Sequence, residues 1–319
     1  MTAGRGHLSL AAALKWRGFQ LAGIALRHSE PAATLLPPLA GGMAYALARG
    51  RRHAVEANLG DLLPDASRTV VRQKAIGVFR SVARYYVELM RLPIVDARVG
   101  HDDTIVEGYE LFEAARAAGK GVIVAGIHLG PAELLLQSFA SRGITYTAMI
   151  ERLQPQLNAL FLQARQRPGQ RYVYADLAGL RALLKALRAG QVVALLVDRD
   201  VTGSGGEVPF AGRTVRAAAG VIELARASGA PIVPAIAQWT DTGKRAIFLQ
   251  PITVERATRG QEALRDAMAA LLSRFLPYLR ARPEDWLMLE RWFVDPASAS
   301  GAGYTGNERP PAAGREGRA

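Results

Sequence analysis

Runs of apolar residues that suit β-strands alternate with helical patterns from about residue 100 onward, and this alternation constrains the fold more than any other feature of the chain. The strand-like runs are 121–127, 144–150, a short run near 173, 192–197, 231–237 and 246–254. Helical patterns separate or follow them at 132–141, 155–166, 177–189, 216–228 and 261–280. Parallel strands need a crossover connection, usually a helix, so this alternation favours parallel pairing. We therefore predict an α/β fold with a mostly parallel central sheet flanked by helices on both faces.

Two of the strand-like runs end in side chains that can do chemistry. The run GVIVAGI (121–127) is followed by His128 and then by Gly130 and Pro131, while VVALLV (192–197) is followed directly by Asp198 and Arg199. The carboxyl ends of parallel strands lie at one edge of a sheet. We therefore expect His128 and Asp198 to face the same crevice.

His128 is the candidate general base, because the other four histidines lie in the N-terminal region or in the loop before the sheet. A catalytic imidazole needs a partner that holds it in the correct tautomer. Asp198 can serve from the neighbouring strand end. Glu133 can serve only if His128 precedes the helix proper, because residues five apart on a helix differ by ~140° after a full turn. As the carboxylate that orients His128, Asp198 and Glu133 rank close together, with Glu207 behind them.

Several motifs resemble those of a known family. HLGPAE (128–133) is similar to the H-x-x-x-x-D/E box of the lysophospholipid acyltransferase-like superfamily, and residues 197–220 resemble a stretch of its bacterial lipid A late acyltransferase and phosphatidylinositol mannoside acyltransferase branch. RRHAVEANL, Glu151-Arg152-Leu153 and RPEDWLMLERWF also match, so the resemblance covers roughly residues 45 to 295. The chain departs from the family where it has Gly130-Pro131-Ala132 in place of Gly-Asn-Trp, and Phe210-Ala211-Gly212 in place of Phe-Phe-Gly. These departures bear on the substrate rather than on the class of reaction.

The resemblance implies an acyltransferase that moves a fatty acyl chain from acyl-CoA or acyl carrier protein to a hydroxyl of a membrane glycolipid. The alternatives are a non-catalytic lipid-binding protein with the same fold and an acyltransferase for a lysophospholipid. Guanidinium groups grip phosphate oxygens in a fork. The expected substrate-binding residues are accordingly four arginines with one carboxylate: Arg152, Arg165, Arg199, Arg216 and Glu207. An internal salt bridge, such as Arg199 with Asp200 or Arg152 with Glu151, is the competing interpretation. Leu134, Leu135, Leu136, Phe139, Trp292 and Phe293 are candidates to line a groove for the acyl chain, or are plain core.

The composition of the chain limits the classes of binding partner and cofactor that it can use. Lys and Arg number 40 against 28 Asp and Glu, and this excess of positive charge predicts an anionic partner such as a membrane surface or a phosphate-bearing substrate. No nucleic-acid-reading motif is present, so nucleic acid is not expected. There is no cysteine, no ligand spacing for a metal and no G-x-S-x-G elbow, so we expect no cofactor and direct transfer without an acyl-enzyme. The TGSGG loop is followed by Glu207 and Pro209, which disfavours dinucleotide binding.

The chain divides into three regions. Residues 1–99 are expected to be helical and membrane-associating, residues 100–296 to form the α/β core, and residues 297–319 to be a disordered tail. The uncharged stretch 31–48 contains three prolines, which makes it a poor straight span, and a basic group follows at Arg49, Arg51 and Arg52. This pattern favours peripheral association with the cytoplasmic face of the inner membrane. Packing on the chain's own core is the equal alternative, also for the amphipathic helix expected at 68–92.

Overall fold

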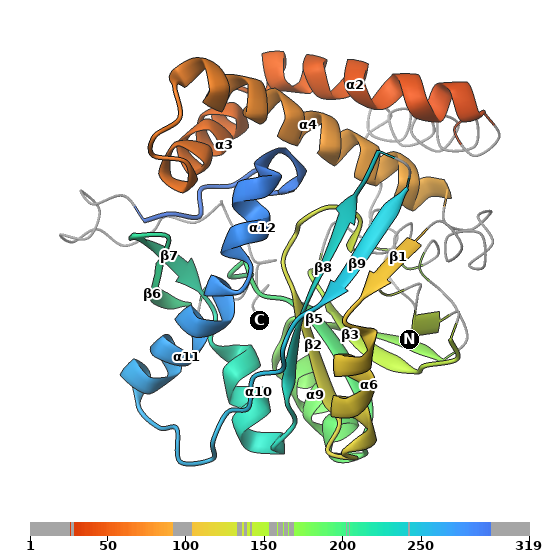
Figure 1. The fold of residues 1–319 in the computed structure, drawn as a ribbon, viewed down its shortest axis with the longest axis vertical. Coiled ribbons are helices and arrows are strands. Elements are labelled where there is room, and N and C mark those ends of the chain that lie inside the picture. The colour runs from red at the N-terminus through yellow and green to blue at the C-terminus, as the bar shows by residue number, and fades with distance from the viewer. Residues whose placement is uncertain are drawn as a thin grey trace, which may run out of the picture.

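The computed structural model of the 319-residue chain describes residues 26, 29–91, 104–132, 136, 139–140, 142–152, 158, 162, 165, 169–201, 203, 205–241 and 243–294. Its centre is a seven-stranded sheet (Figure 1). In spatial order the strands are β1 (Thr104–Glu107), β9 (Lys244–Phe248), β8 (Ile232–Trp239), β2 (Val122–Gly126), β5 (Val192–Leu196), β3 (Tyr146–Ile150) and β4 (Gln170–Tyr174). Every neighbouring pair is parallel except β8 and β9. The predicted mostly parallel sheet is confirmed.

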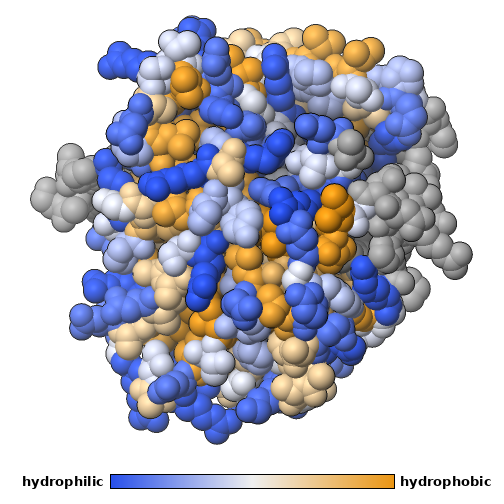
Figure 2. Space-filling view, in the orientation of Figure 1, coloured by the Kyte–Doolittle hydropathy of each residue, from blue (hydrophilic) through white to orange (hydrophobic). Residues whose placement is uncertain are grey.

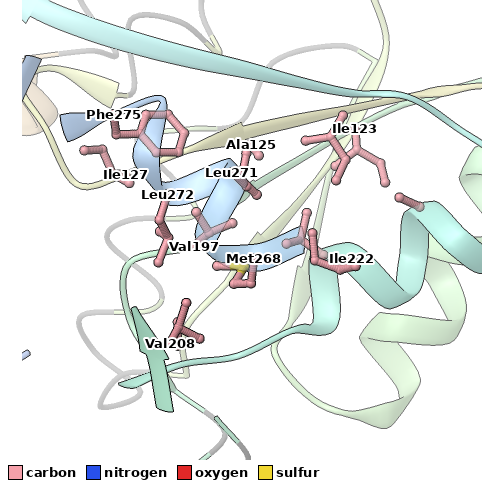
Figure 3. Packing of buried hydrophobic residues seen from close by; sticks show 14 of the residues in the cluster. Ile123, Ala125, Ile127, Val197, Val208, Ile222, Met268, Leu271, Leu272 and Phe275 are labelled. Atoms are coloured by element: carbon pink, nitrogen blue, oxygen red, sulfur yellow. The ribbon is translucent and has the colours of Figure 1, made fainter. Parts of the chain in front are cut away.

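Helices cover both faces of this sheet, as the alternation predicted. One face packs against α9 (Leu177–Arg188), α10 (Gly220–Ser228), α11 (Gln261–Ser273) and α12 (Leu276–Ala281). Figure 3 shows part of this cluster, in which Ile123 and Ala125 of β2 meet Ile222, Met268 and Leu271 from the helices. The opposite face, which carries Val122 and Val124, packs against α6 (Tyr109–Ala117) and Phe139.

Two expectations about local structure are wrong. Residues 216–228 do not form one helix: β6 (Gly206–Phe210) and β7 (Arg213–Ala217) form an antiparallel hairpin, and α10 begins only at Gly220. The hairpin turns through Ala211 and Gly212, both with positive φ, and buries Phe210 and Val215. The helix expected at 261–280 is two helices, α11 and α12, with a proline in the first turn of the second. A proline ring disrupts a continuing helix because it lacks an N–H and crowds the preceding turn.

Before the sheet, the described residues include the helices α2 (Glu30–Leu47), α3 (Arg49–Leu62) and α4 (Arg68–Arg91), which lie across one end of the molecule (Figure 1). The helix α2 is continuous through Pro37 and Pro38. It packs closely against α4 because Gly41 has no side chain: a Cβ at Gly41 would lie only 2.5 Å from the Arg80 Cα. Within the ranges described, no helix is both long and apolar enough to cross a membrane.

The outer side of α2 carries an exposed apolar ridge, visible along the upper edge of the molecule in Figure 2. Its residues recur at helical spacing and are Leu35, Leu36, Leu39, Met43 and Leu47. The inner side buries Pro37, Gly41 and Tyr45. The predicted region boundary near residue 99 and the predicted tail at 297–319 lie outside the described residues, so both stay predictions.

Candidate active site

His128 stands just after β2, and Asp198 stands just after β5, its neighbour in the sheet. The His128 Nδ1 atom lies 2.7 Å from Asp198 Oδ1, and the His128 backbone N–H donates to Asp198 Oδ2 at 2.9 Å. The register aligns Gly126 with Leu196, so the two strands end together. The predicted proximity of these two side chains is confirmed. Their catalytic role stays a prediction.

Asp198 is fully buried, whereas 28% of the His128 side chain is exposed. Burial acts to raise the pKa of the Asp198 carboxyl. The charge of the His128 ring and the hydrogen bonds from that ring, from the Trp286 indole and from the His128 backbone outweigh burial, so the pKa lies below its ordinary value. Asp198 is therefore a carboxylate at neutral pH, and its Oδ1 accepts a hydrogen bond from the Nδ1–H of His128. This arrangement leaves Nε2 of a neutral His128 as the basic nitrogen.

The indole of Trp286 is a contact that the sequence did not reveal. Its Nε1–H donates to Asp198 Oδ2 at 3.0 Å, in a bond between two buried groups. The motif RPEDWLMLERWF matches the family, but nothing in its pattern assigns one tryptophan to a carboxylate 88 residues away.

Residues 284–292, here called the C-terminal strap, close over this site. The His128 carbonyl accepts from the Leu287 N–H at 2.7 Å, and the Gly130 N–H donates to the Asp285 carbonyl at 2.8 Å. Gly130 has φ +64, and a Cβ there would lie 2.4 Å from the Ala237 carbonyl oxygen. Only glycine tolerates both conditions without strain. The turn that presents His128 is thus held between β8 and the strap.

The strap is tied in turn to the N-terminal helices. The buried Asn58 of α3 donates to the Glu290 carbonyl at 2.7 Å and accepts from the Trp292 N–H at 3.0 Å. On α4, Lys74 pairs with Glu284 at 2.8 Å, and Ser81 donates to the Asp285 carboxylate at 3.2 Å. Burial raises the pKa of Asp285, against the opposing effect of Arg282. The strap therefore connects α3 and α4 to the His128 turn.

A cavity of about 490 Å³ opens beside His128. Its floor is one face of the sheet, and the residues of that face change in size along the strands. Towards the strand starts they are Val122, Tyr146, Val192 and Val233, which pack against Phe112 and Phe139. Further along the strands are the small residues Gly126, Ala148, Ala194, Ala235 and Ala237, which line the cavity together with the larger Ile150 and Leu196. The space lies above these small residues.

Arg199 lines the cavity and is engaged by two carboxylates. Its guanidinium donates to Glu151 at 2.8 Å and to Glu290 of the strap at 2.9 Å. Burial acts to lower its pKa, but Glu151 and Glu290 together raise the pKa above its ordinary value. The expected alternative pairing with Asp200 is not the one observed. Arg199 is a fixed positive charge in the cavity wall.

The other predicted site residues are dispersed. Arg165 lines the cavity and donates to the Tyr85 hydroxyl at 3.2 Å. Arg152 does not line it: its side chain is 65% exposed, stacks on Tyr174 and pairs with Asp176 rather than with Glu151. Glu207 and Arg216 oppose each other across the β6–β7 hairpin, also outside the cavity lining. Glu133 lies outside the described residues.

The candidate groove residues divide in the same way. Leu136 lines the cavity, and Leu134 and Leu135 lie outside the described residues. Phe139 is buried in the core beside Phe112, which agrees with the plain-core alternative. Trp292 and Phe293 are also core, packed on Phe210 and Trp286. Across the part of the chain that the structure describes, no three His, Asp or Glu side chains are grouped as metal ligands.

Comparisons with known proteins agree with one family. The model of the bacterial lipid A biosynthesis acyltransferase family matches residues 10–294. A phosphatidylinositol mannoside acyltransferase from Mycobacterium tuberculosis is 30% identical over 263 residues, covering 80% of this chain and 81% of that protein. One from Mycolicibacterium smegmatis is 27% identical over 286 residues, covering 86% and 90%.

Among solved structures, the 1-acyl-sn-glycerophosphate acyltransferase PlsC from Thermotoga maritima is 17% identical, covering 73% of this chain and 98% of that one. Its TM-score of 0.36 is too low to support an inference about the site. The family match and the mycobacterial relatives suffice without it. The chain belongs to the bacterial lipid A biosynthesis acyltransferase family, and it is an enzyme that transfers acyl groups.

Proposed function

We propose that the protein transfers a fatty acyl chain from an acyl thioester, acyl-CoA or acyl carrier protein, to a hydroxyl of a membrane glycolipid. The observation that carries the proposal is the His128–Asp198 pair at the edge of a cavity with an apolar floor. The mycobacterial relatives, named for acylation of phosphatidylinositol mannosides, favour a phosphate-bearing glycolipid as the acceptor.

In the proposed reaction, Asp198 holds the Nδ1–H of His128 and leaves Nε2 to accept the proton of the acceptor hydroxyl. The hydroxyl oxygen attacks the thioester carbonyl carbon, and a C–O bond forms. The tetrahedral intermediate then collapses with cleavage of the C–S bond. His128 returns the proton to the departing thiolate, so the products are an ester and a thiol. A guanidinium N–H of Arg199, which lines the same cavity, donates to the transient oxyanion.

The cavity floor suits the aliphatic part of the donor. Gly126, Ala148, Ala194 and Ala235 present carbon and leave room above the sheet. Burying an acyl chain there contributes about 0.8 kcal/mol for each methylene removed from water. We therefore expect long-chain thioesters to be better donors than short-chain ones.

The acceptor is a lipid, so the enzyme has to work at a membrane surface. The apolar ridge of α2 and the cations Arg49, Arg51 and Arg52 of α3 form an amphipathic surface of the kind that inserts shallowly and is attracted to anionic lipid. We propose peripheral association with the cytoplasmic face of the inner membrane, where acyl thioesters are available.

The test is acyl transfer by the purified full chain in mixed micelles, with acyl-CoA and acyl carrier protein as donors and a phosphatidylinositol mannoside, a lipid A precursor or a lysophospholipid as acceptor. His128→Ala should lower the rate at least ~10²-fold, with the circular dichroism spectrum and melting temperature unchanged. Near-wild-type transfer by folded His128→Ala would contradict the mechanism. Preference for the lysophospholipid would contradict the acceptor class. Thioester binding without turnover on any acceptor would identify a lipid-binding protein instead.

A further inference from the structure

The cavity has a second wall, which the sheet does not provide. Four side chains from the N-terminal helices line it: Arg51 of α3, and Val82, Tyr85 and Tyr86 of α4. Arg51 is exposed, and 41% of Tyr86 is exposed, so this wall forms a rim between the cavity and solvent.

Among the described residues, the three arginines that line the cavity differ in how they are engaged. Arg199 is held by Glu151 and Glu290, and Arg165 donates to the hydroxyl of Tyr85. Arg51 makes no hydrogen bond or ion pair with any residue that the structure describes. Within that part of the chain, Arg51 is the cavity-lining arginine whose guanidinium no protein group engages. A guanidinium in this situation binds an incoming anion without first breaking an internal ion pair.

The position of Arg51 indicates which anion it meets. It lies in the first turn of α3, four residues after Leu47, the last residue of the exposed apolar ridge. If that ridge rests in the membrane, Arg51 stands at the level of the lipid headgroups. A lipid acceptor keeps its tails in the bilayer, so its phosphate lies at that same level while its sugar hydroxyl reaches towards His128.

We propose that Arg51 is the acceptor phosphate-binding residue: its guanidinium binds the phosphodiester of the glycolipid and so places the sugar over the cavity mouth. This assignment rests on the proposed glycolipid acylation. It differs from the sequence-based expectation, in which the phosphate-binding candidates were Arg152, Arg165, Arg199 and Arg216, and Arg51 belonged to a general membrane-attracting group.

The test compares two acceptors in neutral detergent micelles, which remove any attraction to a charged surface: a phosphatidylinositol mannoside and a phosphate-free alkyl mannoside. Arg51→Gln should lower kcat/KM about tenfold for the phosphate-bearing acceptor, mainly through KM. It should leave the KM of the donor and the kcat/KM of the phosphate-free acceptor within twofold of wild type. Arg51→Lys keeps the charge but loses the forked geometry of the guanidinium, so its kcat/KM for the phosphate-bearing acceptor should lie between those of wild type and Arg51→Gln. Arg49→Gln removes the same charge from the same turn, at a residue outside the cavity lining, and should keep the wild-type preference between acceptors.

Equal effects of Arg51→Gln and Arg49→Gln would overturn the assignment in favour of general electrostatics. A rise confined to the KM of the donor would show that Arg51 binds the phosphates of the thioester carrier instead of those of the acceptor. Equal loss on both acceptors would reduce it to a structural role. If the wild-type protein acylates neither acceptor, the proposed function fails. Binding of phosphatidylinositol in the same micelles then still tests whether Arg51 binds a lipid phosphate. Arg51→Gln should then weaken that binding about tenfold and Arg49→Gln should not, and unchanged binding would refute the proposal.

Discussion

Trp286 and Trp292 offer a matched pair of substitutions that isolates one hydrogen bond. Both indoles are buried, their ring centroids are 5.3 Å apart, and replacement of either by phenylalanine removes the same atoms from the same cluster. Trp286 donates its N–H to Asp198. The Trp292 Nε1 is buried and has no hydrogen-bond partner among the described residues. The cost of lost volume is therefore common to both variants, and the difference between them reports the bond to Asp198 together with the relief of the unpaired Trp292 N–H.

The size of that difference follows from the contacts. Asp198 Oδ2 accepts from two donors, the His128 backbone and the Trp286 indole, and Trp286→Phe leaves it with one. A hydrogen bond to a buried charge contributes about 1.5–3 kcal/mol. The free energy of unfolding of Trp286→Phe at neutral pH should therefore be lower than that of Trp292→Phe by about this amount. A less firmly held Asp198 orients His128 less well. We expect kcat to fall about tenfold in Trp286→Phe, with the KM of the donor within twofold, because the defect is in proton transfer rather than binding.

The pH dependence of stability supplies an independent readout. The Trp286 bond helps to hold the folded-state pKa of Asp198 below its unfolded value, so its contribution is complete above the unfolded pKa of ~4 and is lost as pH falls through the folded pKa. The difference in unfolding free energy between the two variants should therefore be largest at neutral pH and shrink in acid. Chemical denaturation at several pH values and steady-state kinetics measure both effects. Equal kcat and equal stability in the two variants would refute the argument that Trp286 positions the dyad.

Three further outcomes are expected from the geometry of the His128 turn, the carboxylate and the ridge. Gly130→Ala should lower the unfolding free energy by at least ~2 kcal/mol, because the new Cβ would clash with a carbonyl and the alanine would have to keep a positive φ. Gly119→Ala also keeps a positive φ but has nothing within 4 Å of its Cβ, so it should lower the unfolding free energy by only ~1 kcal/mol. Equal melting temperatures of the two variants would contradict this. Asp198→Asn should lower kcat at least ~10²-fold with little change in donor KM, whereas Glu133→Gln should have the smaller effect; the reverse order would make Glu133 the partner. Met43→Glu on the α2 ridge should weaken sedimentation with anionic vesicles several-fold, while Leu177→Glu, an equally exposed apolar site on α9, should not, and indistinguishable binding would move the membrane contact elsewhere.

The parts of the site that could be predicted from the sequence are those encoded locally. A buried strand shows itself in its own apolar run, and the meeting of His128 with Asp198 follows from the rule that parallel strands end at one edge. The β6–β7 hairpin was missed because residues 216–228 continue a helical pattern and the strands have only five residues each. Trp286 was missed because its bond to Asp198 joins residues 88 positions apart. The pairing of Arg152 with Asp176, and of Arg199 with Glu290, likewise depends on tertiary placement that no spacing encodes.

The C-terminal strap also has a consequence for biosynthesis. All seven strands of the sheet lie between Thr104 and Phe248, so a growing chain can complete the sheet, with His128 and Asp198 at its edge, while the strap is still unsynthesised. The partners that hold the His128 turn and the Asp198 carboxylate arrive only with residues 285–287, and their anchor on Asn58 only with Glu290 and Trp292. A ribosome that stops a few dozen residues early therefore releases a protein with a whole sheet, in which the His128 turn and the Asp198 carboxylate lack their partners from the strap.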